Sequence, residues 1–203
     1  MSRPPARLGI LLSGRGSNFL ALHRAIEDGR LPAEIALVAS NVPEAPGIHR
    51  ARELGLPTFT LSHRGMKRRE HDRAMVEEIQ RAGAQWVCLA GYMRLLSPVF
   101  VEAFPQRMLN IHPSLLPAFP GLDAQKQAWE HGVKVAGCTV HLVDEGLDSG
   151  PIILQRSVDI DGLGSPQEVA ECILAEEHVA YPEALGRLLS VPWRVEGRRV
   201  LFE

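Results

Sequence analysis

The sequence is poor in cysteine and lysine and lacks any long apolar run. Its 203 residues include only three cysteines. These are far apart and show no CxxC or Cys/His spacing, which excludes a disulfide framework and the common zinc motifs. Hydrophobic residues make up 45%, charged residues 23%, and the net charge is −2. Nothing here indicates a nucleic-acid or membrane surface, and we expect no metal site.

The N-terminal stretch predicts no targeting signal. After MSRPPAR, only Leu8–Leu12 is apolar in type before Ser13 and Gly14 interrupt the run. Such a run is too short for a signal-peptide core or a membrane span. We therefore expect a cytoplasmic protein, and its length favours a single domain over residues 1–203.

Alternating apolar runs and helical periodicity dominate the first two-thirds of the chain. The apolar runs predict buried strands at Leu8–Leu12, Ile35–Ser40, Thr58–Leu61, Trp86–Ala90 and Met108–Ile111. The periodic stretches predict helices at Asn18–Asp28, Gly47–Leu54, Arg68–Arg81 and Pro98–Phe104. Such alternation is typical of an α/β fold, with a Rossmann-like, mainly parallel twisted sheet and helices on both faces.

The pattern changes after about residue 130. Two strands, Val135–Val143 and Pro151–Val158, are separated by the turn-rich stretch Asp144–Gly150. A helix is predicted at Pro166–Leu189, beginning with a capping box from Ser165 to Glu168. Pro182 should kink or split this helix, and Trp193–Phe202 predicts a small hairpin around Gly197.

The loop after the first strand, Ser13–Asn18, reads SGRGSN. Glycines allow a tight turn and close approach to a ligand, and the free amides at a helix start favour an anion. The loop matches neither the dinucleotide fingerprint nor the Walker sequence. It predicts either a single phosphate site or an ordinary capped turn.

Polar residues also follow the last parallel strand. Asn110 and His112 alternate with apolar residues, so both point to one face and could stabilise an oxyanion. One acid of Asp144, Glu145 and Asp148 near His112 would raise the pKa of the imidazole, but the sequence does not choose among them. Gly91–Pro98 (GYMRLLSP) could line a groove for a flat ring, or simply connect a strand to a helix.

Together these segments resemble the folate-dependent glycinamide ribonucleotide formyltransferases. The resemblance rests on LLSGRGSNF, LAGYMRLLSP, LNIHPSLLPAFPG, GCTVHLVDEGLDSGPII and AEEHVAYP, which run from about residue 8 to 182. It implies formyl transfer from 10-formyltetrahydrofolate to glycinamide ribonucleotide in purine synthesis, by a monomer or homodimer that binds neither nucleic acid nor membrane. The substrate phosphate would bind the amino-terminal half and the folate the carboxyl-terminal half.

The resemblance also implies roles for particular residues. Asn110, His112 and Asp148 match the catalytic trio of the family. The ribonucleotide would be held by Gly16, Ser17, Asn18, Leu174 and Glu177. The folate would contact Arg68 (or its neighbours Lys67 and Arg69), Met93, Arg94, Leu95, Leu96, Asn110, Asp144, Glu145, Gly146, Leu147 and Asp148.

Two departures from the family pattern stand out. The family often carries a second histidine where this chain reads Gly121–Gln125, and a larger residue where it has Gly146, which suggests a looser pterin loop. A formyltetrahydrofolate hydrolase or a catalytically silent folate- or nucleotide-binding protein is the alternative. A methionyl-tRNA formyltransferase would need an added RNA-binding domain and a more basic surface.

Overall fold

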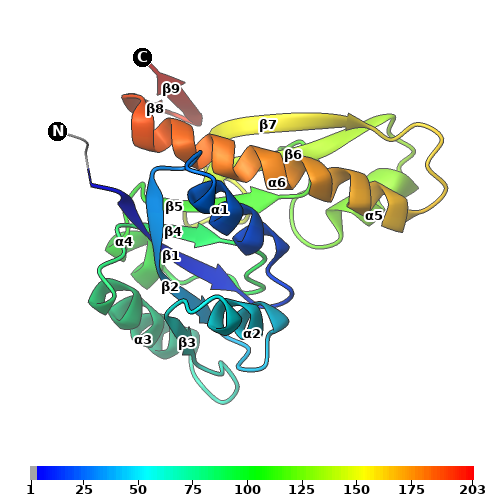
Figure 1. The fold of residues 1–203 in the computed structure, drawn as a ribbon. Coiled ribbons are helices and arrows are strands. Elements are labelled where there is room, and N and C mark those ends of the chain that lie inside the picture. The colour runs from blue at the N-terminus through cyan, green and yellow to red at the C-terminus, as the bar shows by residue number, and fades with distance from the viewer. Residues whose placement is uncertain (1–3) are drawn as a thin grey trace. The chain divides into compact units, whose positions relative to one another are not determined.

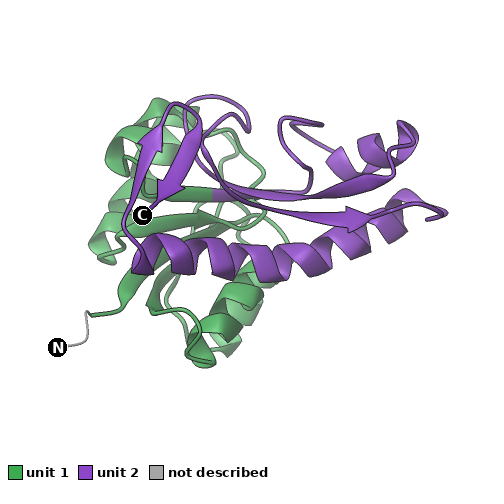
Figure 2. Cartoon of the chain, turned by 90° about the horizontal axis from the view of Figure 1, so that it is seen from above, with its two compact units in different colours: residues 1–109 green, residues 110–203 purple. Residues whose placement is uncertain are grey.

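The computed structural model describes residues 4–203. The chain divides into two compact units, one ending at Leu109 and the other running from Asn110 to Glu203 (Figure 2). Among the described residues, no helix is long and apolar enough to cross a membrane.

The first unit is built on parallel strands in the order β3-β2-β1-β4-β5. Their bounds are Ala6–Leu12 for β1, Ala33–Ser40 for β2, Thr58–Thr60 for β3, Trp86–Leu89 for β4 and Met108–His112 for β5, whose end lies in the second unit. The pairs of β1 with β2 and β4, and of β2 with β3, are all parallel. The predicted α/β class with a mainly parallel sheet is thus confirmed, each expected strand lying within two residues of its predicted bounds.

Helices cover both faces of this sheet (Figure 1). They are α1 (Ser17–Glu27), α2 (Pro46–Glu53), α3 (Arg68–Arg81) and α4 (Pro98–Ala103). The chain adds strands in one direction through α1 and α2 and in the other through α3 and α4. Right-handed crossovers therefore put the two pairs on opposite faces. The direction reverses between β1 and β4, and ligands of open α/β sheets bind at such a point, beyond the carboxyl ends of the strands.

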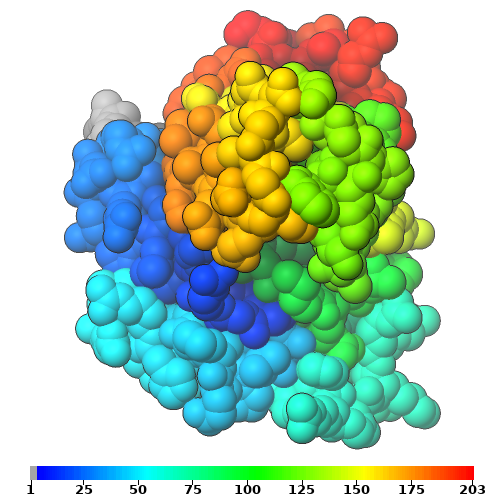
Figure 3. Space-filling view, turned by 90° about the vertical axis from the view of Figure 1, so that its right-hand side faces the viewer, coloured from blue at the N-terminus to red at the C-terminus, as the bar shows by residue number. Residues whose placement is uncertain are grey.

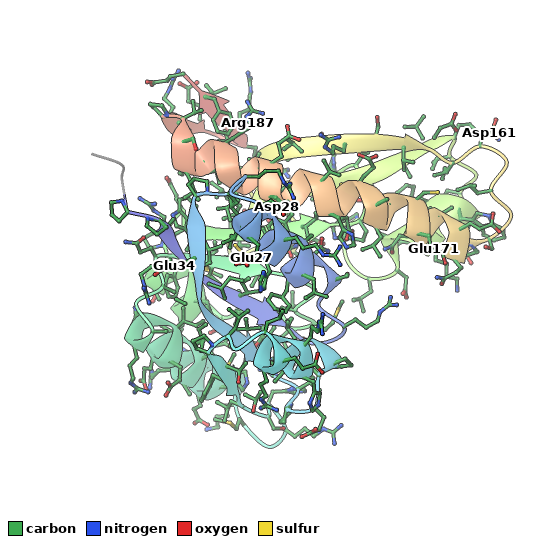
Figure 4. The ribbon with its side chains drawn as sticks, in the orientation of Figure 1. Glu27, Asp28, Glu34, Asp161, Glu171 and Arg187 are labelled. Atoms are coloured by element: carbon green, nitrogen blue, oxygen red, sulfur yellow. The ribbon has the colours of Figure 1, made fainter. Side chains whose placement is uncertain are left out.

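The second unit contains an antiparallel pair and a long helix. β6 (Val135–Leu142) pairs antiparallel with β7 (Ile152–Asp159). The predicted C-terminal hairpin is confirmed as β8 (Trp193–Glu196) and β9 (Arg199–Phe202), paired antiparallel. Asp161, in the loop after β7 (Figure 4), accepts a hydrogen bond from Lys134 Nζ at 2.6 Å, which connects the start of β6 to the residues that follow β7.

Helix α6 (Pro166–Ser190) begins with the predicted capping box. Ser165 Oγ accepts from Glu168 N at 3.3 Å, and Glu168 Oε2 accepts from Gly164 N at 3.0 Å. Of the kink or split expected at Pro182, the split is wrong, because the helix continues through this residue. Tyr181 and Ala184 on either side are fully buried, and this packing outweighs the backbone hydrogen bond that proline removes.

A short helix, α5 (Ala124–Glu130), was not expected from the sequence. Only Ala124 and Ala128 of its seven residues are buried, which leaves almost no periodic signal. It packs against α6, and Trp129 Nε1 donates to Leu163 O at 3.2 Å. In the space-filling view, the yellow-green segment containing α5 lies beside the gold and orange residues that lead into α6 (Figure 3).

The other end of α6 is tied to the C-terminal hairpin. The Arg187 guanidinium, labelled in Figure 4, lies 4.2 Å from the ring centre of Phe202 on β9. Trp193 Nε1 donates to Leu188 O at 3.1 Å. The hairpin therefore anchors the C-terminal turn of the long helix.

Candidate active site

The last residues of β5 direct two polar side chains to the same face of the strand. Because side chains alternate along a strand, Asn110 and His112 point together while Leu109 and Ile111 are buried in the other direction. Both reach one carboxylate. Asn110 Nδ2 lies 3.5 Å from Asp148 Oδ1, and His112 Nδ1 lies 3.3 Å from Asp148 Oδ2.

Asp148 occupies the centre of this cluster. Its side chain is only 9% exposed, and its Oδ2 accepts a hydrogen bond from Gly121 N at 2.8 Å. The backbone of Asp148 is left-handed, with φ 51°, a conformation that aspartate tolerates better than most residues. Of the three acids that the sequence left open, this is the one that faces His112. Asp144 instead accepts from Gly146 N and Ser149 Oγ, and Glu145 is exposed.

His112 is 5% exposed and contacts an acceptor through each ring nitrogen. Its Nε2 lies 2.8 Å from the carbonyl oxygen of Phe119, and its Nδ1 faces the Asp148 carboxylate. Neither a carbonyl nor a carboxylate oxygen can donate. The ring form that satisfies both contacts is therefore the imidazolium, which carries a proton on each nitrogen.

A second histidine, His141 on β6, belongs to the same cluster, although sequence reasoning assigned it no role. Its Nε2 lies 3.2 Å from Asn110 Nδ2 and 3.8 Å from Asp148 Oδ1. Burial lowers the pKa of His141, against the smaller opposing effects of the Leu142 carbonyl and the Asp148 carboxylate. A signal was available, because Thr139 and His141 alternate with apolar neighbours on one strand.

Thr139 was also missed, and it holds the proline-rich loop after His112. Its hydroxyl donates to Ser114 O at 2.7 Å and accepts from Leu116 N at 3.0 Å. Gln155 Nε2, on β7, donates to both Leu116 O and Thr139 Oγ1 at 2.9 Å. Ser114 Oγ donates to Ala118 O at 2.5 Å. This loop is therefore fixed by buried hydrogen bonds in addition to its prolines.

In the first unit, the SGRGSN segment forms a tight turn into α1. Gly16 has φ 73° and precedes Ser17, the first helical residue, while Asn18 is buried. Gly47 N donates to Gly14 O at 3.0 Å, and a Cβ on Gly16 would come within 3.2 Å of Gly47 Cα. Two glycines thus let two backbone segments touch, and the amides at the start of α1 suit an anion.

The segment after β4 is held by the same turn. Ser13 Oγ accepts from Met93 N at 2.8 Å and donates to Asn41 Oδ1 at 2.6 Å. Met93 and Leu95 are 69% and 58% exposed, although both are large and apolar. Ser97 N donates to the buried Asp72 Oδ2 at 2.7 Å. An anchored loop therefore presents apolar side chains to the outside, as a ring-binding surface requires.

The remaining expected binding residues lie on helices and on one loop. Lys67, Arg68 and Arg69 are all exposed at the start of α3. Leu174 and Glu177 share a face of α6, where Glu177 is 6% exposed. Burial, followed by the charge of Glu177, raises the pKa of Cys138 to about 12.

The loop expected to surround a pterin, Asp144–Asp148, is held by hydrogen bonds to Asp144. Asp144 Oδ1 holds Gly146 N at 3.0 Å and Ser149 Oγ at 2.7 Å, while Leu147 at its tip is 54% exposed. A Cβ on Gly146 would come within 2.1 Å of Ser149 Oγ, so this turn has no room for a larger residue as it stands. Residues 4–203 contain no group of three or more His, Cys, Asp or Glu side chains able to hold a metal ion.

Comparisons with known proteins agree with these features. The family model for formyl transferases matches residues 6–185. Phosphoribosylglycinamide formyltransferase of Bacillus subtilis (strain 168) is 38% identical, over 94% of this chain and 98% of the relative. The Escherichia coli (strain K12) enzyme of that name is 39% identical, over 96% of this chain and 89% of the relative.

Longer relatives and a solved structure match as well. The chain is 45% identical to the trifunctional purine biosynthetic protein adenosine-3 of Drosophila pseudoobscura pseudoobscura, over 94% of its own length but only 14% of that relative. The crystal structure of glycinamide ribonucleotide transformylase 1 from Symbiobacterium toebii superposes with a TM-score of 0.96 at 46% identity, covering 99% of this chain and 95% of that one. With the family model covering most of its length, this chain belongs to the formyl transferase family.

Proposed function

We propose that this protein transfers the formyl group of 10-formyltetrahydrofolate to the amine of glycinamide ribonucleotide, a step of purine biosynthesis. The observation that carries the proposal is the contact of Asn110 and His112 with the single carboxylate of Asp148. An amide donor, an imidazole and a buried acid together match the needs of acyl transfer from one nitrogen to another. The names of the relatives supply the substrates.

The reaction would proceed by direct attack. The neutral amine of the ribonucleotide attacks the formyl carbon, and the carbonyl oxygen becomes an oxyanion. Asn110 would donate to this oxygen and the positive charge of His112 would stabilise it; one oxyanion donor contributes roughly 3–4 kcal/mol. The new C–N bond is kept, the bond to N10 of the folate breaks, and the proton of the amine moves to N10. Asp148 would keep His112 charged and relay this proton through water.

Binding would be divided between the two units. The turn at Gly16, Ser17 and Asn18 would take the phosphate on its backbone amides, and Leu174 and Glu177 would contact the ribonucleotide. The pterin would meet the apolar side chains of Met93–Leu96 and the loop Asp144–Asp148. Arg68, exposed at the start of α3, would contact the folate. In this proposal residues 1–203 act as one formyltransferase domain.

The setting of the reaction is also part of the proposal. Three scattered cysteines without a disulfide suit a reducing compartment, so we place the enzyme in the cytoplasm. Its partners would be its two small-molecule substrates, and it would act without a metal as a monomer or homodimer.

A deformylation assay tests the proposal. The purified protein is mixed with 10-formyl-5,8-dideazafolate, and absorbance is followed with and without glycinamide ribonucleotide. We expect deformylation that requires the ribonucleotide and is lost in His112→Ala. Deformylation without it would indicate a hydrolase, and folate binding without turnover would indicate a binding protein.

A further inference from the structure

His141 lies in the catalytic cluster, but formyl transfer as proposed gives it no task. It is 3% exposed, and its two ring nitrogens face partners of opposite kinds. Nδ1 lies 2.8 Å from the carbonyl oxygen of Leu142, and Nε2 lies 3.2 Å from the amide nitrogen of Asn110. A buried ring held at both nitrogens can have only one arrangement of its protons.

That arrangement follows from the partners. The Leu142 carbonyl only accepts, so Nδ1 of His141 must carry a hydrogen. The Asn110 amide nitrogen only donates, so Nε2 must offer its lone pair. A cationic ring would set an N–H against an N–H at this contact. The neutral ring with its proton on Nδ1 satisfies both partners.

The orientation of the Asn110 amide is fixed by a second contact. Its Nδ2 also lies 3.5 Å from Asp148 Oδ1. Rotating the amide by half a turn would set its oxygen against that carboxylate oxygen, with no hydrogen between two acceptors. Asn110 therefore directs its nitrogen, and both of the hydrogens on it, toward His141 and Asp148.

The charges around His141 act in both directions. The carboxylates of Asp148 and Asp144 favour a cationic ring, and the nearby His112 opposes it. Burial is the largest effect and lowers the pKa of His141, which agrees with the neutral ring that the hydrogen bonds require. A neutral His141 does not compete for the Asp148 carboxylate, which contacts His112, Gly121 and Asn110.

We propose that His141 is a positioning residue for the reaction. Its Nε2 accepts one hydrogen of the Asn110 amide and thereby sets the direction of the other. That second hydrogen faces Asp148 Oδ1 at 3.5 Å, the outer limit of a hydrogen bond, and is taken over by the formyl oxygen when that becomes an oxyanion. The inference rests on the proposed function, because only in formyl transfer does Asn110 donate to an oxyanion. The two hydrogens of one amide nitrogen have a fixed angle between them, so holding one sets the direction of the other.

The proton arrangement is measured first, without turnover. The uniformly ¹⁵N-labelled protein is examined by NMR correlation of the histidine ring nitrogens, and the signals of His141 are assigned by their loss in His141→Leu. We expect Nδ1 protonated and Nε2 unprotonated across the neutral pH range. A proton on Nε2, or a cationic ring at neutral pH, would overturn the proposal.

Kinetics then test the role. In His141→Leu, kcat should fall about tenfold, the equivalent of one hydrogen bond, with KM for both substrates little changed. His141→Gln should recover most of kcat, because its side-chain oxygen can accept near the position of Nε2. His131→Leu is the matched control, since this exposed histidine also places its Nδ1 2.8 Å from a backbone carbonyl, that of Gln127. It should retain wild-type kcat.

A double-mutant cycle separates positioning from general structural support. If His141 acts through Asn110, His141→Leu should cost nothing further in kcat when Asn110 is already alanine. Additive losses would contradict the proposal. Should the wild-type protein show no formyl transfer at all, the proposed function fails. The ring protonation and the Asn110 side-chain amide signals in His141→Gln and His141→Leu then decide the contact by themselves.

Discussion

The turn at residues 13–18 and the cluster around Asp148 are both expected to bind substrate. The turn would do so through main-chain groups and the cluster through side chains. The turn is made by the main chain. Gly16 is left-handed, Gly47 packs against it, and the amides at the start of α1 are the donors that we expect to bind the phosphate. The cluster is made by side chains from separate segments, with Asn110 and His112 on β5, His141 on β6 and Asp148 in a loop.

This difference determines what each region tolerates. A site of backbone amides depends on the space around the chain, so added bulk should harm it while surface charge matters less. A site of interlocking side chains depends on which atoms donate and which accept, so an isosteric change of chemistry should harm it. The following variants test this contrast, from the largest expected effect to the smallest.

Asp148→Asn should have the largest effect. The amide keeps the shape of the carboxylate but places an NH₂ group or a neutral oxygen against His112, and the cation loses its partner. We expect kcat to fall about a hundred- to ten-thousand-fold in the formyl-transfer assay. Asp161→Asn, the same change at an exposed site of the same unit, is the control. Full activity of Asp148→Asn at neutral pH would contradict the role of this acid.

Gly16→Ala tests the turn by adding bulk alone. The new methyl would meet Leu12, Gly47 and Phe19 at 3.1–3.3 Å in a left-handed backbone, which costs about 1–2 kcal/mol before the contacts are counted. The KM for glycinamide ribonucleotide should rise more than kcat falls. Gly29→Ala has nearly the same φ, 69°, but meets no atom within 4 Å. Equal effects of the two variants on this KM would show that the close packing is irrelevant to binding.

Thr139→Val should lower stability without changing charge. The isosteric valine removes the hydroxyl that connects Ser114 O, Leu116 N and Gln155 Nε2. Ser114 O and Leu116 N lose this buried partner, while Gln155 Nε2 keeps its bond to Leu116 O. We expect the free energy of unfolding in urea to fall by about 1–3 kcal/mol. Thr58→Val on β3, where the residue is half-buried, should cost clearly less. An unchanged free energy of unfolding in Thr139→Val would contradict the role of this hydroxyl in fixing the loop.

The smallest effect is expected at Cys138, whose thiol should not react with an alkylating reagent in the folded protein. Its pKa is raised to about 12, chiefly by burial, so at a pH four units lower roughly one thiol in ten thousand is ionised. Iodoacetamide under mildly alkaline conditions should therefore label the half-buried Cys172 and spare Cys138, as read by peptide mass spectrometry. Early labelling of Cys138 in folded protein would contradict this.

The raised pKa of Cys138 also makes the free energy of unfolding depend on pH. The folded thiol holds its proton more tightly than an unfolded one, so this contribution to stability is fully present below the ordinary pKa of 9.0. It is lost as the pH rises toward about 12.

Local patterns predicted the elements well where a signal repeats. The buried strands of the first unit, its helices and the glycines at three helix ends (Gly29, Gly55 and Gly83, all left-handed) follow from short-range rules. Helix α5 was missed because two buried alanines give no pattern. The expected split at Pro182 was wrong because burial on both sides of the proline outweighs its local preference.

The sequence by itself determined the α/β class, the glycine turn into α1, and the shared direction of Asn110 and His112, because each depends on neighbours along the chain. Only the tertiary structure decided which acid faces His112, that His141 holds Asn110, and that Thr139 fixes the loop between them. Those contacts join residues 25 to 36 positions apart. Their geometry depends on strand pairing and on the left-handed backbone at Asp148, which no local pattern encodes.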